Sequence, residues 1–204
     1  MCEKDIILNH FNNISTKYDE NNKKLYWKLA DDLLWEIVKK YIPRNKSITF
    51  LELGAGTGEW AYKILKEFDN TRCVLVDFSD NMLSQAELKL EKFKDRVKII
   101  NSDIKNLKLD ERFDIILNIY VLPFFDSADK LIEIVSSHLK SKGISISVGE
   151  NFYNALALNM LKGNSSEVKN VVEKEIGALS QYVPQLHFNK IDELEKIHKN
   201  HDIM

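Results

Sequence analysis

The chain has 204 residues, of which 44% are hydrophobic and 29% charged, a balance typical of a folded domain with its own core. Its 29 basic and 31 acidic side chains give a formal net charge of −2, so no overall positive field favours nucleic acid or an anionic membrane. Two cysteines without metal-ligand spacing, a polar amino terminus and the lack of a long apolar run predict a reduced, cytoplasmic protein without a metal site, a signal peptide or a membrane span.

The first part of the chain, residues 1–45, is predicted to be helical. Residues 11–18 favour a short helix and a loop. Over about residues 20–42, apolar side chains recur at helical spacing between charged ones, which predicts a longer helix that Pro43 ends. We expect these elements to form a helical cap.

Residues 46–150 alternate short apolar runs with amphipathic stretches. The apolar runs predict strands at Ser47–Leu53, Arg72–Asp77, Val97–Ile100, Phe113–Asn118 and Gly143–Val148. The stretches between them predict helices at Gly58–Phe68, from a Ser79 cap onward, and at Ser127–Leu139. Such alternation predicts an α/β fold of the Rossmann-like, doubly wound type, with a mostly parallel sheet and helices on both faces.

The last part, residues 151–204, is again predicted to be helical. Helices are expected at Asn151–Leu161 and Ser165–Tyr182, and Pro184 ends the second. Asn189 is in position to cap a third helix, with Asp192 three residues on. We expect a helical cap or insert followed by a final helix.

Three glycines leave the first predicted strand and open the next helix, in Glu52-Leu53-Gly54-Ala55-Gly56-Thr57-Gly58-Glu59. They permit a tight turn and let a ligand lie against bare backbone. The spacing is G-x-G-x-G, whereas a dinucleotide-binding G-x-G-x-x-G loop requires a glycine where Glu59 stands. Glu52, just before the first glycine, would repel a pyrophosphate but not a ligand with an amino group.

Two more acids follow predicted strands. Asp77 lies about 20 residues after the glycines, where a carboxylate accepts hydrogen bonds from ribose hydroxyls. Asp103 follows Ser102 after the third strand and could accept from an adenine amino group, while the Ile104 N–H donates to a ring nitrogen. Because carboxyl ends of parallel strands meet at one edge, we expect Glu52, Asp77 and Asp103 to line one crevice.

Over about residues 46–150 these motifs resemble class I S-adenosylmethionine-dependent methyltransferases. The resemblance implies S-adenosylmethionine as cofactor and S-adenosylhomocysteine as product. It places Glu52 near the methionine amino group, Asp77 on the ribose, the Asp103 position at the adenine, and Phe78 and Met82 against the adenine ring. The implied cofactor-binding set is Glu52, Gly54, Ala55, Gly56, Gly58, Asp77, Phe78, Met82, Ser102, Asp103, Ile104, Asn118 and Tyr18.

The resemblance extends to two further segments. Residues 118–122 match the fourth-strand segment that passes the transferred methyl group, and they include Tyr120, which we consider as a catalytic residue or as core packing. Residues 14–19 are similar to the start of quinone-biosynthesis methyltransferases, in which a tyrosine, here Tyr18, often closes over the cofactor; a surface aromatic on a flexible arm is the alternative. His187 lies where relatives place acceptor contacts, although an exposed loop histidine is the alternative.

This chain also departs from the family's pattern. Pro123 and Phe124 stand where many relatives have a histidine pair, which puts histidine-assisted transfer in doubt. The family's usual seven-stranded sheet ends in a hairpin, and residues up to 204 stop on the helix before it. We therefore expect its last strands to be missing, in a truncated, incompletely represented or naturally short chain, with an open edge that favours a homodimer.

The favoured function is in-line methyl transfer to a small, partly apolar acceptor, selected by the helical cap. Two alternatives stay open. One is a methyltransferase acting on a peptide or another macromolecule, for which the neutral charge disfavours RNA. The other is a protein that binds the cofactor without catalysis.

Overall fold

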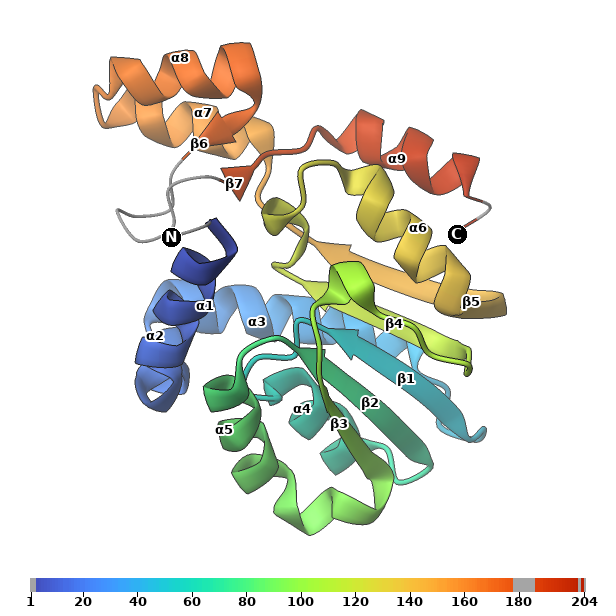
Figure 1. The fold of residues 1–204 in the computed structure, drawn as a ribbon. Coiled ribbons are helices and arrows are strands. Elements are labelled where there is room, and N and C mark those ends of the chain that lie inside the picture. The colour runs from blue at the N-terminus through green and yellow to red at the C-terminus, as the bar shows by residue number, and fades with distance from the viewer. Residues whose placement is uncertain (1–2, 178–185, 202, 204) are drawn as a thin grey trace.

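The computed structural model describes residues 3–177, 186–201 and 203 (Figure 1). Five parallel strands form the described sheet in the order β3-β2-β1-β4-β5. The strands are β1 (Ile48–Leu53), β2 (Thr71–Asp77), β3 (Val97–Asn101), β4 (Phe113–Ile119) and β5 (Leu139–Val148). The prediction of a Rossmann-like, mostly parallel α/β sheet is confirmed, with each predicted strand present. The largest difference is at β5, which begins four residues earlier than predicted.

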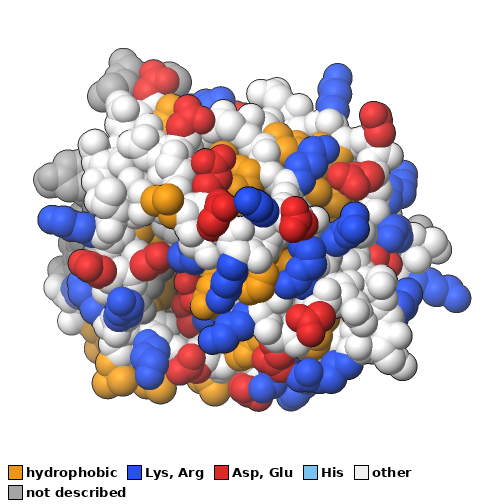
Figure 2. All heavy atoms as spheres, turned by 90° about the horizontal axis from the view of Figure 1, so that it is seen from below, with side chains coloured by type: hydrophobic (Ala, Val, Ile, Leu, Met, Phe, Trp, Pro, Cys, Tyr) orange, Lys and Arg blue, Asp and Glu red, His pale blue; other side chains and the backbone are white. Residues whose placement is uncertain are grey.

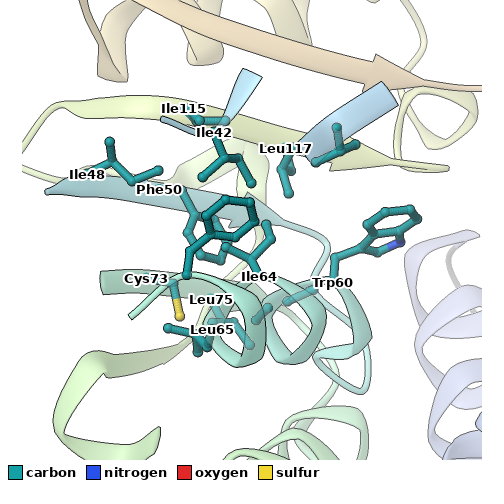
Figure 3. Packing of buried hydrophobic residues seen from close by; sticks show 14 of the residues in the cluster. Ile42, Ile48, Phe50, Trp60, Ile64, Leu65, Cys73, Leu75, Ile115 and Leu117 are labelled. Atoms are coloured by element: carbon teal, nitrogen blue, oxygen red, sulfur yellow. The ribbon is translucent and has the colours of Figure 1, made fainter. Parts of the chain in front are cut away.

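Helices cover both faces of the sheet (Figure 1). On one face α3 (Leu25–Val38), α4 (Glu59–Glu67) and α5 (Asp80–Leu90) surround a core cluster that contains Phe50, Ile64 and Leu75 (Figure 3). On the other face α6 (Ala128–His138) and α9 (Ile191–Asn200) pack over Leu51, Val76 and Ile116. Burial on both faces explains why the strands read as nearly continuous apolar runs.

The amino-terminal helices lie beyond the carboxyl ends of the strands (Figure 1). These helices are α1 (Glu3–Ile14), a 3-10 helix (Ser15–Lys17) and α2 (Tyr18–Asn22). The chain then continues into α3 on the face of the sheet and ends this part with a 3-10 helix (Lys39–Tyr41). The prediction of one helix over residues 20–42 was wrong, because the chain is broken at Lys24, whose ψ of 142° is extended. No proline or glycine marks this break, and the apolar positions that predicted the helix all follow it.

The carboxyl-terminal part contains α7 (Phe152–Leu161) and α8 (Ser165–Lys174), which pack against each other away from the sheet (Figure 1). The predicted helix Ser165–Tyr182 is too long, because Glu175 adopts a left-handed φ of 55° and a short strand β6 (Ile176–Gly177) follows. Strand β6 pairs antiparallel with β7 (Leu186–His187). Residues 178–182 of the predicted helix lie outside the described residues.

The final helix α9 begins later than predicted. Asn189 forms a bridge with Asn151 instead of capping the helix, and Lys190 takes the N-cap position without a side-chain cap bond. Among the described residues, none of the helices has the length and apolar character that a membrane crossing requires. Figure 2 shows a face on which acidic and basic side chains are mixed, with hydrophobic atoms reaching the surface between them.

Candidate active site

The glycine loop between β1 and α4 has a conformation that requires glycine. Gly54, Gly56 and Gly58 have φ values of 69°, 53° and 71°, in the left-handed region. A Cβ atom on Gly54 would lie 2.3 Å from Val121 Cγ2, and one on Gly58 would lie 3.1 Å from Ala86 Cβ. At Gly56 the same atom would meet nothing within 4 Å, so this glycine leaves bare backbone facing open space.

Asp77, at the end of β2, fixes this loop. Its Oδ2 accepts a hydrogen bond of 2.8 Å from the Gly56 N–H, and its Oδ1 accepts one of 2.9 Å from the Ser79 N–H. Burial raises the pKa of Asp77, and the backbone N–H groups of Ser79, Gly56 and Phe78 oppose that rise. A carboxylate has about four lone-pair sites, so Asp77 can hold the loop and still accept from a ligand.

Asp103 lies after β3 and is joined to the amino-terminal cap. Its Oδ2 is 2.6 Å from the Lys4 ammonium, and its Oδ1 accepts 3.0 Å from the Lys105 N–H. Partial burial disfavours the charged form of Asp103, but these hydrogen bonds outweigh it and hold its pKa below the ordinary value. A ligand amino group at this carboxylate would therefore lie beside Lys4 or displace it.

A cavity of about 390 Å³ lies between the strand ends and the cap. This volume is within the range of small-molecule sites. Sequence-predicted residues on its wall are Tyr18, Gly54, Gly56, Asp77, Phe78, Met82, Asp103, Ile104, Tyr120 and His187. The remaining wall residues are Lys4, Ile7, Phe11, Lys105, Ile119, Val121, Pro123, Phe124, Phe125 and Asp126. One cavity therefore joins the glycine loop, two of the three strand-end acids and an aromatic wall.

Glu52, the third acid, is not on the cavity wall. Its side chain is 3% exposed, and its Oε2 accepts 3.1 Å from the Ala61 N–H in the first turn of α4. Burial raises the pKa of Glu52 to about 8. The described structure thus places a largely protonated carboxyl group beneath the glycine loop at neutral pH.

Four other predicted residues also lie off the cavity wall: Ala55, Gly58, Ser102 and Asn118. Asn118 is fully buried, and its side-chain Nδ2 and Oδ1 have no hydrogen-bond partner among the described residues. Ser147, which pairs with Asn118 in β5, likewise has a buried Oγ without a hydrogen-bond partner among the described residues. The Ser102 N–H donates 2.9 Å to the Asp77 carbonyl oxygen, which ties β3 to β2.

Tyr120 follows β4 in a strained conformation. Its φ is 59°, which is uncommon for a bulky residue and typical of positions that the surrounding structure holds in place. Its N–H donates 2.7 Å to the Val148 carbonyl, and its ring meets Trp27 edge-on at 5.7 Å. Burial, more than the nearby Asp31 and Glu150, raises the pKa of Tyr120 to about 12. The phenol can donate a hydrogen bond but is a poor base near neutral pH.

The cap is bound to the glycine loop by contacts that sequence reasoning missed. The Thr57 hydroxyl donates 2.6 Å to Asp19 Oδ1, and Lys89 pairs with Asp19 at 2.7 Å and Glu59 at 2.9 Å. The Ser79 hydroxyl, on the other side of the loop, donates 2.6 Å to Asn12 Oδ1. In the sequence, the only indication of a role for Asp19 was its position directly after Tyr18, in the segment 14–19 that resembles the start of quinone-biosynthesis methyltransferases.

Comparison with known proteins agrees with this geometry. A methyltransferase domain family model matches residues 50–143. That segment carries the glycine loop and the strand ends, so this part of the chain is similar to methyltransferase domains, which supports the resemblance to class I S-adenosylmethionine-dependent methyltransferases.

Two curated relatives and one solved structure show how far the similarity extends along each chain. A malonyl-[acyl-carrier protein] O-methyltransferase of Priestia megaterium is 28% identical over 143 residues, covering 70% of this chain and 50% of the relative. A demethylmenaquinone methyltransferase of Protochlamydia amoebophila is 39% identical over 84 residues, covering 41% of this chain and 35% of that protein. A solved S-adenosylmethionine-dependent methyltransferase of Clostridium acetobutylicum, 25% identical with a TM-score of 0.56, covers 70% and 60% of the two chains. The chain thus spans half or less of the length of these two curated relatives.

Proposed function

We propose that this protein transfers the methyl group of S-adenosylmethionine to a small, partly apolar acceptor. The observation that carries the proposal is that one cavity joins the bare backbone of Gly56 and the carboxylate of Asp77 to a wall containing Phe11, Phe124 and Phe125. Polar groups at one end and aromatic rings at the other suit a nucleoside next to an apolar acceptor.

The residues of the cavity fit the cofactor. Gly56 presents backbone without a side chain, and Asp77 retains acceptor sites for two ribose hydroxyls. Phe78 and Met82 provide apolar surface for the adenine, and Asp103 and Ile104 lie beside them on the wall. When bound, S-adenosylmethionine supplies a methyl group that its sulfonium has already activated.

The chain's own residues have a positioning task in this proposal. Tyr120 and Tyr18 are proposed to face the sulfonium end, where aromatic faces stabilise positive charge. The protonated phenol of Tyr120 can orient an acceptor through a hydrogen bond. The aromatic wall and the cap exclude water, so alignment of acceptor and methyl group provides most of the rate acceleration. His187 lies on the same wall, where it can contact an acceptor.

Two measurements test the proposal. The melting temperature of the purified chain should rise with S-adenosylhomocysteine and not with NAD, because only a ligand that binds the native state stabilises it. The chain should also convert a component of a metabolite extract into a product heavier by one methylene, detected by mass spectrometry with labelled cofactor. Labelling of a protein fraction alone would favour the macromolecular alternative. Cofactor binding without transfer to either fraction would contradict the enzymatic proposal.

A further inference from the structure

Helix α3 turns a continuous apolar stripe to solvent. Leu25 is 74% exposed, Leu33 69%, Tyr26 68%, Leu29 52% and Ile37 49%. From Tyr26 onward these residues recur at intervals of three or four, and with Leu25 they lie on one side of the helix along about 18 Å. Single exposed apolar side chains are common, but a contiguous stripe of this kind marks an interaction surface.

The opposite side of α3 is already occupied. Leu34, Trp35 and Val38 pack into the core cluster beneath the sheet. Trp27 contacts the Tyr120 ring, and Asp31 lies 4.0 Å from the Lys63 ammonium. The exposed stripe therefore cannot turn inward without breaking contacts at the edge of the active-site cavity.

A column of exposed charges runs beside the stripe, at intervals of four residues. It reads Lys24, Lys28, Asp32 and Glu36, two cations followed by two anions. This order is complementary to itself when two copies of the helix run antiparallel about a centre near Ala30. Lys24 of one copy then faces Glu36 of the other, and Lys28 faces Asp32, each twice. Glu36 also pairs with Lys39, the C-cap residue of the same copy's α3, at 2.5 Å.

The apolar side chains fit the same antiparallel arrangement. Leu29 lies next to its counterpart, and Tyr26 lies next to Leu33 of the other copy. With Tyr41, 49% exposed at the end of the stripe, the apolar side chains offer on the order of 700 Å² per copy, close to the roughly 800 Å² that each partner contributes to a standard interface.

We propose that α3 is the interface of a two-fold symmetric homodimer, with the stripe at its centre and the charge column at its rim. Closed two-fold dimers are the commonest assemblies of soluble chains, and one self-complementary surface suffices to build them. Since Trp27 and Asp31 lie on the inner side of the same helix, the dimer would brace the wall that holds Tyr120. This proposal stands independently of the proposed function.

Sedimentation velocity over a range of protein concentrations tests the interface. The wild-type chain should sediment as a dimer at micromolar concentration. The double variant L29E/L33E should sediment as a monomer, with a dissociation constant raised at least a hundredfold. Leu88→Glu is the matched control, because Leu88 is 74% exposed on α5 and lies outside the proposed surface. This control variant should remain dimeric.

A charge exchange tests the antiparallel arrangement and does not depend on removing apolar groups. Lys28→Glu alone and Asp32→Lys alone should each raise the dissociation constant about tenfold, since each places like charges opposite one another. The double variant K28E/D32K should restore the wild-type value. Circular dichroism spectra and melting temperatures of all variants should stay close to those of the wild type, which shows that they are folded by a measurement that does not involve the cofactor site.

Several outcomes would overturn the proposal. A wild-type chain that stays monomeric at 100-fold higher concentration, or a dimer that survives L29E/L33E, rules out this interface. Failure of K28E/D32K to restore association rules out the antiparallel pairing. A monomer that instead sediments with phosphatidylglycerol vesicles through the same leucines would assign the stripe to a lipid surface.

Discussion

At the scale of single residues, the candidate site rests on a few positions with more than one task. Asp77 holds the glycine loop through both carboxylate oxygens while forming part of the cavity wall. Tyr120 occupies a strained conformation against Trp27. Such positions can be tested by substitutions that separate their contribution to binding from their contribution to folding.

Gly56 offers the sharpest of these tests. In Gly56→Val the added side chain enters the cavity, because its Cβ meets no protein atom within 4 Å. We expect affinity for S-adenosylhomocysteine, measured by calorimetry, to fall by at least a hundredfold. Gly163→Val is the control, since Gly163 has a similar φ of 67° and equally open surroundings between α7 and α8. If both variants bind S-adenosylhomocysteine with the same affinity, the side chain at position 56 does not obstruct the ligand. Any loss relative to the wild type would then come from backbone strain.

Asp77→Ala removes the acceptor that we assign to the ribose. Stranding paired hydroxyls should weaken cofactor binding by about 1–3 kcal/mol, again measured by calorimetry. Asp114→Ala provides the comparison, because Asp114 also accepts several hydrogen bonds, from Thr49 and Lys140, but is not on the cavity wall. If Asp77→Ala binds as tightly as Asp114→Ala, the ribose lies elsewhere.

Tyr120→Phe separates a positioning role from base catalysis. The pKa of about 12 keeps the phenol protonated throughout the neutral range, so we expect no increase in rate between pH 7 and 10 that depends on Tyr120. Losing one hydrogen bond of about 0.5–1.5 kcal/mol should slow turnover by about twofold to thirteenfold. A thousandfold loss, together with a pH–rate limb that disappears in the variant, would instead identify Tyr120 as the base.

At the scale of elements, much of the fold could be predicted because local pattern and tertiary environment agree. Strands buried on both faces read as apolar runs, and glycines with left-handed φ mark the loop. The helix boundary at Glu175 could not be predicted, because apolar periodicity continues through it, and at Lys24 no proline or glycine marks the break. Periodicity also identified α3 without showing which face it buries, and its most apolar stripe faces outward.

Contacts between distant segments were equally inaccessible to sequence reasoning. The Thr57–Asp19 and Lys4–Asp103 pairs join residues that no spacing rule connects. The wall position of Asp77 was predictable from the end of its strand. The position of Glu52 away from the cavity was not, because strand alternation alone does not show where the cavity opens.

The pairing of α2 with the glycine loop predicts a coupled effect. Lys89→Met removes the ammonium that joins Asp19 to Glu59 and leaves these carboxylates without their cation. We expect faster amide hydrogen exchange in α1 and α2, together with a threefold to thirtyfold loss of cofactor affinity, since hydrogen bonds to charged groups contribute about 1.5–3 kcal/mol before solvent exposure reduces them.

Lys92→Met is the control for this pairing, because Lys92 lies on the same side of the molecule but contacts Tyr62 and Phe93. Exchange in α1 and α2 should then match the wild type. If Lys89→Met changes exchange without affecting affinity, the cap does not support the cofactor loop.

At the scale of the whole molecule, stability depends on pH through buried ionisable groups, and Glu52 is the one that we select for a test. Glu52 lies under α4, and burial raises its pKa to about 8, above its ordinary value of 4.5. The native state therefore holds a proton that the unfolded chain releases. Stability from this group is complete below about pH 4.5 and is lost as the pH rises towards 8.

Glu52→Gln should remove this dependence while keeping the shape of the side chain. We expect the variant to gain stability relative to the wild type as the pH rises from 5 to 8, and the difference to level off above pH 8. Urea unfolding at each pH measures the difference in the free energy of unfolding between the variant and the wild type. Asp114→Asn serves as the opposite case, because hydrogen bonds hold the pKa of Asp114 below its ordinary value. That variant should lose stability relative to the wild type as the pH rises through the acid range. A Glu52→Gln difference that is constant between pH 5 and 8 would mean that Glu52 is ionised in the native protein, with a cation or water beside it.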